Sequence, residues 1–405
     1  MTALINALLD SLRRQAAERD FAVQLAFWDG TRARLSGPTQ RDSPVTLHLK
    51  RPAAVLALLR ADLARLGRAY VEDAIDVEGP AAAVVRVATE LAAPAEATRR
   101  RRLSWAPWRH SRRRDARAIA HHYDVSNAFY SLWLDPRLVY SCAYFRSDAD
   151  TLEQAQEHKL DLICRKLQLQ PGEHLLDIGC GWGALVLWAA RHYGVSAVGV
   201  TLSENQAALA RERVKAAGLE GRVEIRLQDY REIPEADGYD KIASVGMFEH
   251  VGHKNLPIYF GAVRRLLREG GLFLNHGITE LSDPDSGVRS GAGDFIERYV
   301  FPEGELPTLA HAIEQMARQK LEVYDVEGLR PHYARTLTHW VERLEAQREA
   351  ALALVPEATW RIWRVYLAGS ALAFERGWIS IHQVLATKCE AGPSTQPGTR
   401  DYLLS

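Results

Sequence analysis

The chain of 405 residues is long enough for two domains, or for one domain with large insertions. Hydrophobic residues make up 47% and charged residues 25%, which are ordinary values for a soluble globular protein. Lys plus Arg and Asp plus Glu each total 51, so the overall charge gives no support to a nucleic-acid-binding function. The four cysteines are scattered, without the spacing of a metal site or of a disulfide framework.

Residues 1–97 predict a small α+β domain. The N-terminal segment MTALINALLDSLRRQ has the periodicity of an amphipathic helix and lacks the basic start and apolar core of a signal peptide. Residues 44–50 resemble a strand, and residues 53–79 have apolar side chains at helical spacing followed by a short extended piece. No chemical motif occurs in this part. No apolar run reaches the roughly 18 residues that a membrane span needs, and we expect a cytoplasmic protein.

From Ile119 onward, strand-like and helix-like segments alternate, as in doubly wound α/β domains. We expect residues 119–405 to form one domain, joined to the first by a linker over residues 98–118. The predicted strands are EHLLDI, VSAVGVTLS, RVEIRLQD, YDKIASVGMFE, GGLFLNHG, LEVYDVEGL and WISIHQVLATK. The first of these runs into a glycine turn that opens a helix, which is typical of a nucleotide site at the carboxyl edge of a parallel sheet.

The glycine spacing indicates the kind of nucleotide. Gly179, Gly181 and Gly183 form G-x-G-x-G instead of the G-x-G-x-x-G of dinucleotide-binding folds. Asp177 precedes them by two residues, where its carboxylate would attract an ammonium or a sulfonium group and repel a pyrophosphate. The pattern resembles the first motif of class I S-adenosylmethionine (SAM) methyltransferases.

Three further segments follow the next strands in the order of the methyltransferase layout, namely TLSENQ (201–206), QDY (228–230) and FEH (248–250). In that layout they line the ribose, adenine and substrate sides in turn. The usual acidic ribose ligand is replaced by Thr201, whose hydroxyl can still form a hydrogen bond. The resemblance implies that SAM is bound by Tyr140, Ser141, Asp177, Gly179, Cys180, Gly181, Gly183, Thr201, Leu202, Gln206, Gln228, Asp229 and Tyr230.

Several longer motifs resemble the cyclopropane-fatty-acid synthases, a family that includes the mycolic acid cyclopropane synthases. The motifs are HHYDVSNAFYSLWLDPRLVYSCAYF (121–145), LLDIGCGWG, GVTLSENQ, SVGMFEHVG and FIERYVFPEGELP (295–307). The resemblance runs from about residue 119 to 390 and implies a class I SAM-methyltransferase doubly wound sheet with helical insertions. It also implies that the SAM methyl carbon is transferred to a cis double bond of a phospholipid acyl chain, with later closure of a cyclopropane ring.

The implied reaction makes particular demands on the site. An alkene is a weak nucleophile, so its position beside the sulfonium must supply much of the acceleration. Methyl transfer leaves a carbocation, which needs a dry cavity and is stabilised by aromatic faces. In the family, the base that then removes a proton is a bound bicarbonate. Its binding site maps here onto Cys142, Glu249, His276, Ile278 and Tyr333. Glu249 can accept the bicarbonate hydroxyl proton, and His276 and Tyr333 can donate to its oxygens.

Each of these residues also has a structural interpretation. A buried Cys142 alone is usually a small core residue, a lone His276 is more often structural, and Tyr333 can pack at the start of a helix. Their joint occurrence in recognisable motifs favours the catalytic interpretation. Glu249 has the strongest individual case, because a strand-end acid beside a cofactor is costly to bury without a purpose. His250 either orients the loop or takes a direct part.

Two positions depart from the family pattern. Ser370 stands where many members carry a cysteine that was proposed as catalytic. Because the cation mechanism needs no thiol nucleophile, we interpret that cysteine as dispensable. His253 stands where a proline is common, a loop change without evident chemical meaning.

A phospholipid substrate would require the enzyme to dock on a membrane surface. The segment 99–117 contains nine arginines and two tryptophans, and arginines attract anionic head groups while tryptophans favour the interface. A solvated linker is the alternative interpretation, and an RNA-binding interpretation lacks a nucleic-acid fold. Residues 360–374 either line an acyl channel or pack in the core. We expect peripheral association with the inner face of the membrane. We also expect a homodimer and no bound metal.

Three rival functions remain open. Amine N-methyltransferases share the FEH element, but they tend to have an acidic residue where Gly246 stands and MKNY where this chain has VGHKN. A fatty-acyl methyltransferase would add a methyl or methylene branch without closing the ring, and the sequence separates the two outcomes poorly. A non-catalytic lipid-binding protein is a rival from another class, which the intact cofactor and bicarbonate motifs argue against.

Overall fold

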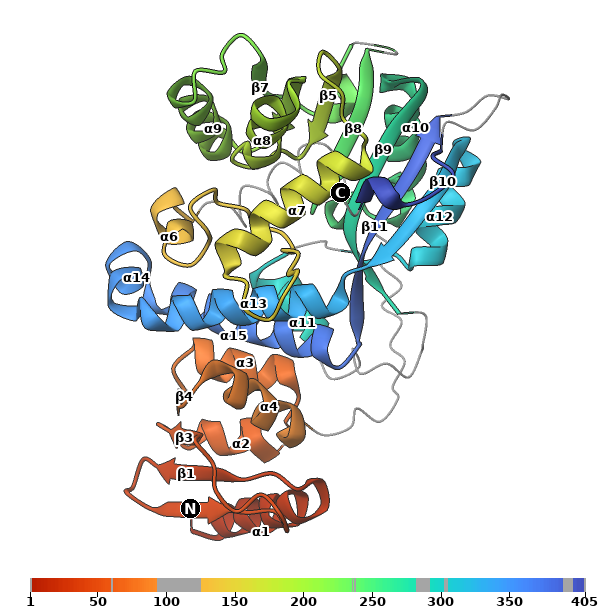
Figure 1. Cartoon of the computed structure of the whole chain (residues 1–405). Helices are drawn as coiled ribbons and strands as arrows, with labels where there is room; N and C mark the ends of the chain where they lie inside the picture. The colour runs from red at the N-terminus through yellow and green to blue at the C-terminus, as the bar shows by residue number, and fades with distance from the viewer. Residues whose placement is uncertain are drawn as a thin grey trace. The chain divides into compact units, whose positions relative to one another are not determined.

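The computed structural model describes residues 2–59, 61–92, 125–234, 236, 238–281, 292–301, 305–388 and 396–403 (Figure 1). The chain divides into two compact units, which are described separately below. The first consists of Met1–Trp105, Asp283–Pro302 and Leu337–Trp378, and the second of Ala106–Ser282, Glu303–Thr336 and Ile379–Ser405. The Arg/Trp-rich segment 98–118 lies outside the described residues, as do residues 121–124, the first four of the motif 121–145.

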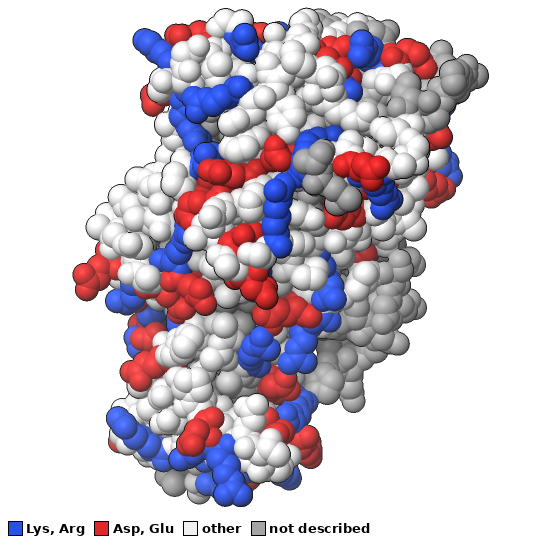
Figure 2. Space-filling model, in the orientation of Figure 1, with Lys and Arg blue, Asp and Glu red and all other residues white. Residues whose placement is uncertain are grey.

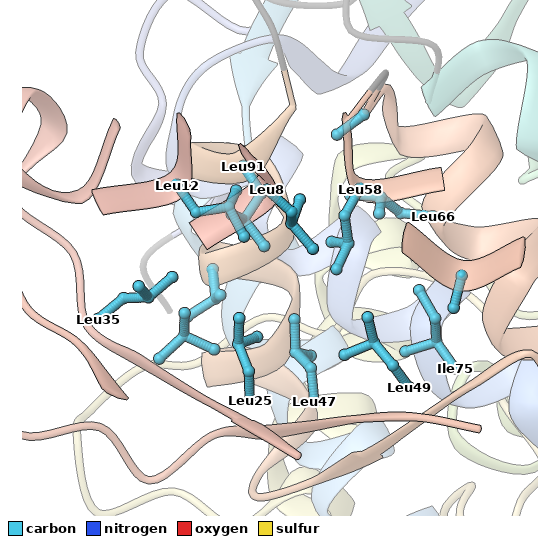
Figure 3. Close-up of a cluster of buried hydrophobic side chains, with 14 of the residues drawn as sticks. Leu8, Leu12, Leu25, Leu35, Leu47, Leu49, Leu58, Leu66, Ile75 and Leu91 are labelled. Carbon is cyan, nitrogen blue, oxygen red and sulfur yellow. The ribbon is translucent and has the colours of Figure 1, made fainter. Parts of the chain in front are cut away.

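The N-terminal part of the first unit is a four-stranded sheet with helices, in agreement with the predicted α+β module. Its elements are α1 (Thr2–Arg19), β1 (Val23–Phe27), β2 (Arg32–Leu35), β3 (Thr46–Leu49), α2 (Ala53–Leu59), α3 (Leu63–Val71), β4 (Ile75–Glu78) and α4 (Ala81–Leu91). The strand order is β2-β1-β3-β4, and only β1 and β3 run parallel. Figure 3 shows leucines of the helices and strands meeting in one apolar core, which includes Leu8, Leu25, Leu47 and Leu66.

Helices from the C-terminal half of the chain complete the first unit. They are α11 (Ala292–Tyr299), the second part of α13 (Arg330–Ala346), α14 (Arg348–Leu354) and α15 (Glu357–Glu375). Two buried arginines of α15 reach the N-terminal module: Arg361 donates to the carbonyl oxygen of Tyr70 at 2.8 Å, and Arg364 donates to the Gly79 carbonyl oxygen at 2.6 Å. Because buried guanidinium groups need several acceptors, these contacts fix α15 against the module.

The second unit is built on a seven-stranded sheet. Its strands are β5 (His174–Ile178), β6 (Ser196–Thr201), β7 (Val223–Leu227), β8 (Tyr239–Val245), β9 (Leu267–Glu280), β10 (Leu321–Gly328) and β11 (Ile379–Lys388). The order is β10-β11-β9-β8-β5-β6-β7, and β11 runs antiparallel to both of its neighbours. Six of the strands lie within the segments predicted to form them, and β9 extends beyond its predicted segment GGLFLNHG at both ends. The doubly wound sheet is therefore confirmed.

Helices cover both faces of this sheet (Figure 1). They are α6 (Asn127–Ser131), α7 (Leu152–Lys166), α8 (Ala184–Tyr193), α9 (Glu204–Ala216), α10 (Leu256–Leu266) and α12 (Leu309–Arg318). Side chains of α7, α8 and α9 share one apolar cluster, and those of α10 and α12 share another. Leu175 and Leu176, adjacent on β5, enter different clusters, because successive side chains of a strand point to opposite faces.

Charged side chains of both signs are interspersed over the face shown in Figure 2, in keeping with the net charge of zero. Within the part of the chain that the structure describes, no helix combines the length and the apolar character that crossing a bilayer requires.

Candidate functional site

The glycine turn after β5 has the backbone that its sequence predicts. Gly179, Gly181 and Gly183 all have positive φ angles, of 84°, 53° and 80°, a region that residues with a Cβ rarely adopt. At Gly179 a side chain is also excluded by space, because an added Cβ would lie 2.9 Å from the Cβ of Met247. Gly183 is the N-cap of α8, so the turn delivers the chain directly into that helix. The local sequence therefore builds an open turn at the carboxyl edge of the sheet.

A cavity of about 140 Å³ lies at this edge. Its lining comes from the loop before α7, from α7 itself, from the glycine turn, and from the segments that follow β6, β7 and β8. All of the residues predicted to bind SAM line it except Gly183 and Asp229. Tertiary packing has therefore brought together side chains that span residues 140–230 of the chain.

Asp177 supplies a buried carboxyl group in this cavity. Its Oδ1 atom is buried and has no hydrogen-bond partner among the described residues. Burial raises the pKa of Asp177 to about 7, an effect that the ammonium group of Lys159 partly opposes. A positively charged ligand group would provide the missing partner and favour the ionised carboxylate, as the sequence predicts for this position.

Glu249 lies just beyond β8, in the short helix η2 (Phe248–His250). Its Oε1 atom accepts a hydrogen bond from the backbone N–H of Ile278 on β9, at 2.6 Å. Its Oε2 atom is buried without a partner among the described residues, and burial raises the pKa of Glu249 to about 7. One oxygen is therefore fixed by the sheet, while the other remains available to a ligand.

His276 lies two residues before Ile278 on β9 and is fully buried. Its Nδ1 atom is 3.3 Å from Nε2 of Gln383, and its Nε2 atom is buried without a partner among the described residues. Burial holds the pKa of His276 well below its ordinary value, so the imidazole is neutral. When the Gln383 amide donates to Nδ1, the proton of the neutral ring is on Nε2, which becomes a hydrogen-bond donor.

Cys142 and Tyr333 belong to segments that hydrogen bonds connect to the same strands. The Cys142 thiol is 3.9 Å from the carbonyl oxygen of Leu329, whose N–H donates to Ile381 at 2.9 Å. Ile381 is the register partner of Ile278 on β9. Tyr333 lies one turn into α13, with its N–H donating to Leu329. Burial raises the pKa of Cys142, so its sulfur is a protonated thiol and a weak nucleophile.

Comparisons with known proteins agree with this geometry. Residues 110–384 match the family described as mycolic acid cyclopropane synthetase, and residues 12–97 match a domain of unknown function. The chain belongs to the mycolic acid cyclopropane synthetase family. As a member of this family with the class I fold, it is a SAM-dependent methyltransferase.

Two relatives and one solved structure illustrate the similarity. A probable fatty acid methyltransferase of Pseudomonas putida is 50% identical over 382 residues, which are 94% of this chain and 95% of that protein. The cyclopropane-fatty-acyl-phospholipid synthase of Escherichia coli K12 is 43% identical over 272 residues, which are 66% of each protein. A mycolic acid cyclopropane synthase solved with SAH and CTAB is 38% identical and has a TM-score of 0.65 over 67% of this chain and 98% of its own.

Within the methyltransferase site, the ribose and adenine positions have local partners. The Thr201 hydroxyl donates to Oε1 of Gln206 at 2.9 Å, which orients the amide and leaves its Nε2 group as a donor. Asp229 is engaged by its own neighbour, because its carboxylate accepts from Nε of Arg231 at 2.9 Å and from the second guanidinium nitrogen at 2.6 Å. Asp229 thereby shapes the turn that places Tyr230 and Arg231 in the cavity wall.

Among the cavity residues that sequence reasoning missed are a lysine and an arginine, Lys159 and Arg231. Lys159 lies on α7 and its Nζ atom donates to the Ser141 hydroxyl at 2.8 Å. One signal was available: Lys159 is followed by Leu160 and Ile163, which face the core, so the helical spacing places a lysine beside an apolar face. Arg231 directly follows the predicted QDY segment and offered no comparable signal.

Proposed function

We propose that this methyltransferase acts on a cis double bond of a phospholipid acyl chain and forms a cyclopropane ring, with a bound bicarbonate as the base. The observation that carries the proposal is the pair of buried, unpartnered polar atoms Glu249 Oε2 and His276 Nε2, on segments joined by the bond between Glu249 and Ile278. A buried acceptor and a buried donor without partners are costly in a folded protein, which favours a role in binding a small polar group.

The cavity residues fit SAM, which supplies a methyl carbon attached to a sulfonium when it is bound. Asp177 would accept from the ammonium group of its methionine part. Gln206 would hydrogen-bond the ribose, and Tyr230 with Gln228 would border the adenine. The rings of Tyr140 and Trp182 line the cavity and each packs against Tyr130, with ring centroids 5.7 and 5.1 Å apart. Aromatic faces stabilise cations, which suits a site for a sulfonium.

The residues expected around bicarbonate, which include Glu249, His276 and Tyr333, fit this ion, which would supply a base of low nucleophilicity. Glu249 would accept its hydroxyl proton, and the neutral His276 would donate through Nε2. Tyr333 and the backbone beside Cys142 would complete the site. The protonated, buried thiol of Cys142 would not capture a carbocation. This combination of a held base and no exposed nucleophile is what ring closure requires.

A branched product is the second candidate outcome, because the relative of Pseudomonas putida is named a probable fatty acid methyltransferase. The outcomes share the transfer of the methyl carbon. A ring and a methylene branch both lose a proton from the added carbon, whereas a methyl branch keeps its three hydrogens and the proton leaves from the acyl chain. We favour the ring because the residues expected around bicarbonate are all present, and because the Escherichia coli relative is a cyclopropane-fatty-acyl-phospholipid synthase.

Lipid mass spectrometry tests this proposal. Purified enzyme is incubated with SAM and vesicles of a cis-unsaturated phospholipid, and the acyl chains are analysed before and after catalytic hydrogenation. We expect the acyl chain to gain one methylene unit and to resist mild hydrogenation. The Glu249→Gln variant should lose this activity, whereas Glu224→Gln, which changes an exposed residue of β7, serves as the matched control and should keep it. A product that takes up hydrogen like an alkene would contradict ring formation.

We further propose peripheral association with the cytoplasmic face of the membrane through the arginines and tryptophans of residues 99–117. Co-sedimentation with vesicles measures this association. Binding should increase with the content of anionic lipid and decrease with salt. Binding that ignores both variables would contradict electrostatic docking.

A further inference from the structure

The side chain of Lys159 is the strongest unexplained feature of the cavity. It is 1% exposed, lines the cavity, and lies on the same wall as Ser141, to whose hydroxyl it donates at 2.8 Å. Helix α7 positions it rigidly, because Thr151 and Gln154 form a capping box at the start of the helix. Lys159 is thus a built part of the cavity and not a solvated surface residue.

The charge of Lys159 is not neutralised by a direct partner. Among the described residues no carboxylate oxygen lies within 4.0 Å of its Nζ atom, and Ser141 is its one hydrogen-bond acceptor. Burial accordingly lowers the pKa of Lys159 to about 8. A buried ammonium with spare N–H donors and no counter-ion is strongly disfavoured unless a ligand supplies the anion.

The opposite charge needed by a ligand is present in the same cavity. Asp177 lines it with a buried carboxyl oxygen that also has no partner. Lys159 and Asp177 influence each other electrostatically, yet their charged atoms are more than 4.0 Å apart. Two opposite charges that share a cavity without touching are suited to a zwitterion, whose ammonium and carboxylate groups are attached to the same carbon atom.

We propose that Lys159, together with the Ser141 hydroxyl, binds the carboxylate of the methionine part of SAM, while Asp177 binds the ammonium. The proposal rests on the proposed function only in that SAM is the ligand, and it does not depend on the methyl acceptor. The alternative role for Lys159 is to balance the charge of Asp177 without touching the ligand. The two roles predict different results when the carboxylate is removed from the ligand, because the affinity falls only if Lys159 binds that group.

Binding calorimetry with two ligands distinguishes these roles. The ligands are SAH and its decarboxylated analogue, which keeps the ammonium group, and both are measured without lipid. The wild-type enzyme should prefer SAH by about 30-fold or more, the range expected for truncating one partner of a buried, hydrogen-bonded charge pair. In Lys159→Met the preference should fall to about twofold or less, because the carboxylate no longer has a receptor. Lys215→Met, at an exposed position of α9, is the matched control and should keep the full preference.

The wild-type comparison alone can overturn the proposal, so the test survives a variant that fails to fold. Equal affinity of the wild-type enzyme for both ligands would exclude a carboxylate receptor, even if the enzyme modifies lipids normally. An undiminished preference in Lys159→Met would exclude Lys159 as that receptor. Failure of SAH itself to bind would overturn this proposal together with SAM binding at the cavity, whereas a failed lipid assay with normal SAH preference would affect the proposed function alone.

Discussion

Helix α7 carries two buried lysines, Lys159 and Lys166, which lie two turns apart and have different partners. Lys166, near β10, lies 2.5 Å from Oε2 of Glu327 and 4.0 Å from Oδ2 of Asp325. Lys159, in the cavity wall, has the Ser141 hydroxyl and no carboxylate at that range among the described residues. Each side chain is 1% exposed, so the difference is not one of burial. Near β10, carboxylates of the chain itself neutralise the charge of Lys166. In the cavity wall, the charge of Lys159 remains to be neutralised by a ligand.

The same contrast extends to the carboxyl edge of the sheet. Asp177 lies near the end of β5, Glu249 follows β8, and His276 on β9 is the register partner of Val245, the last residue of β8. Each of the three has a buried polar atom without a partner among the described residues. By comparison, the buried arginines of α15 meet several acceptors, Arg364 contacting Glu345, Tyr70 and Gly79. Asp177, Glu249 and His276 thus lack partners of the kind that the buried arginines of α15 have, which is in keeping with the ligand-binding roles proposed for them.

The largest expected effect concerns Glu249. In Glu249→Gln the buried oxygen loses its negative charge but keeps its size, so turnover should fall by at least about 100-fold while SAH affinity changes by less than about threefold. Steady-state kinetics and SAH calorimetry measure the two quantities. Near-normal turnover would contradict this account, because it would show that the unpaired carboxyl group of Glu249 has no role in the reaction.

The pH dependence of stability gives a second test of Glu249. Burial raises its pKa from the ordinary value of 4.5 to about 7, so the folded chain holds a proton that the unfolded chain releases between these values. The unfolding free energy of the wild-type protein should therefore fall relative to that of Glu249→Gln as pH rises from about 4.5 to about 7, by about 3 kcal/mol in total. Urea denaturation of both proteins at several pH values measures the difference. A difference independent of pH would contradict the burial of an ionisable group there.

Substituting the two lysines separates structure from function. Lys166→Met should lower the free energy of unfolding by about 2 kcal/mol, because it leaves Glu327 and Asp325 without their buried cation; the partial exposure of Glu327 keeps the loss below that of a fully buried pair. Lys159→Met should leave the free energy of unfolding of the ligand-free protein unchanged or raised, because it removes an uncompensated charge. Urea denaturation without SAH is the measurement. Equal destabilisation by both substitutions would contradict the view that Lys166 stabilises the fold and Lys159 does not.

The smallest expected effect is on cofactor affinity at Asp177. Asp177→Asn should weaken SAH binding by about tenfold, since the amide accepts a hydrogen bond from the ligand ammonium without a charge. Calorimetry with 5′-methylthioadenosine, which lacks the amino-acid part, is the matched comparison and should show little change. Equal losses for the two ligands would indicate a distorted glycine turn and not a lost ion pair.

Much of the sheet was predictable from the sequence. Apolar runs bounded by turns identified all seven strands of the second unit, and the spacing of Gly179, Gly181 and Gly183 located the cavity, because these features depend on local geometry. The residues chosen for the bicarbonate site came from motif resemblance, and their roles remain predictions. Glu249 and Ile278 are 29 residues apart in the chain, so no local sequence pattern predicts the hydrogen bond between them.

Features created by long-range packing escaped prediction. The helical spacing of α7 places Lys159 beside an apolar face, but it does not identify the partner Ser141, which belongs to another segment. The union of α15 with the N-terminal module depends on Arg361 and Arg364 meeting Tyr70, a contact across almost 300 residues of chain. The division into domains 1–97 and 119–405 remains a prediction, since the compact units of the structure include residues from both.

The fate of the transferred methyl group tests the central claim most directly. The wild-type enzyme is given SAM with a fully deuterated methyl group and vesicles of a cis-unsaturated phospholipid, and the acyl chains are analysed by mass spectrometry. Ring closure through loss of one hydrogen from the added carbon predicts that two of its three deuterium atoms are retained in an acyl chain that resists mild hydrogenation. A methylene branch would also retain two deuterium atoms, but its double bond would take up hydrogen. Retention of all three would show a branch in place of a ring, and an acyl chain without label would show that lipids are not the acceptor; either result contradicts the cyclopropane assignment.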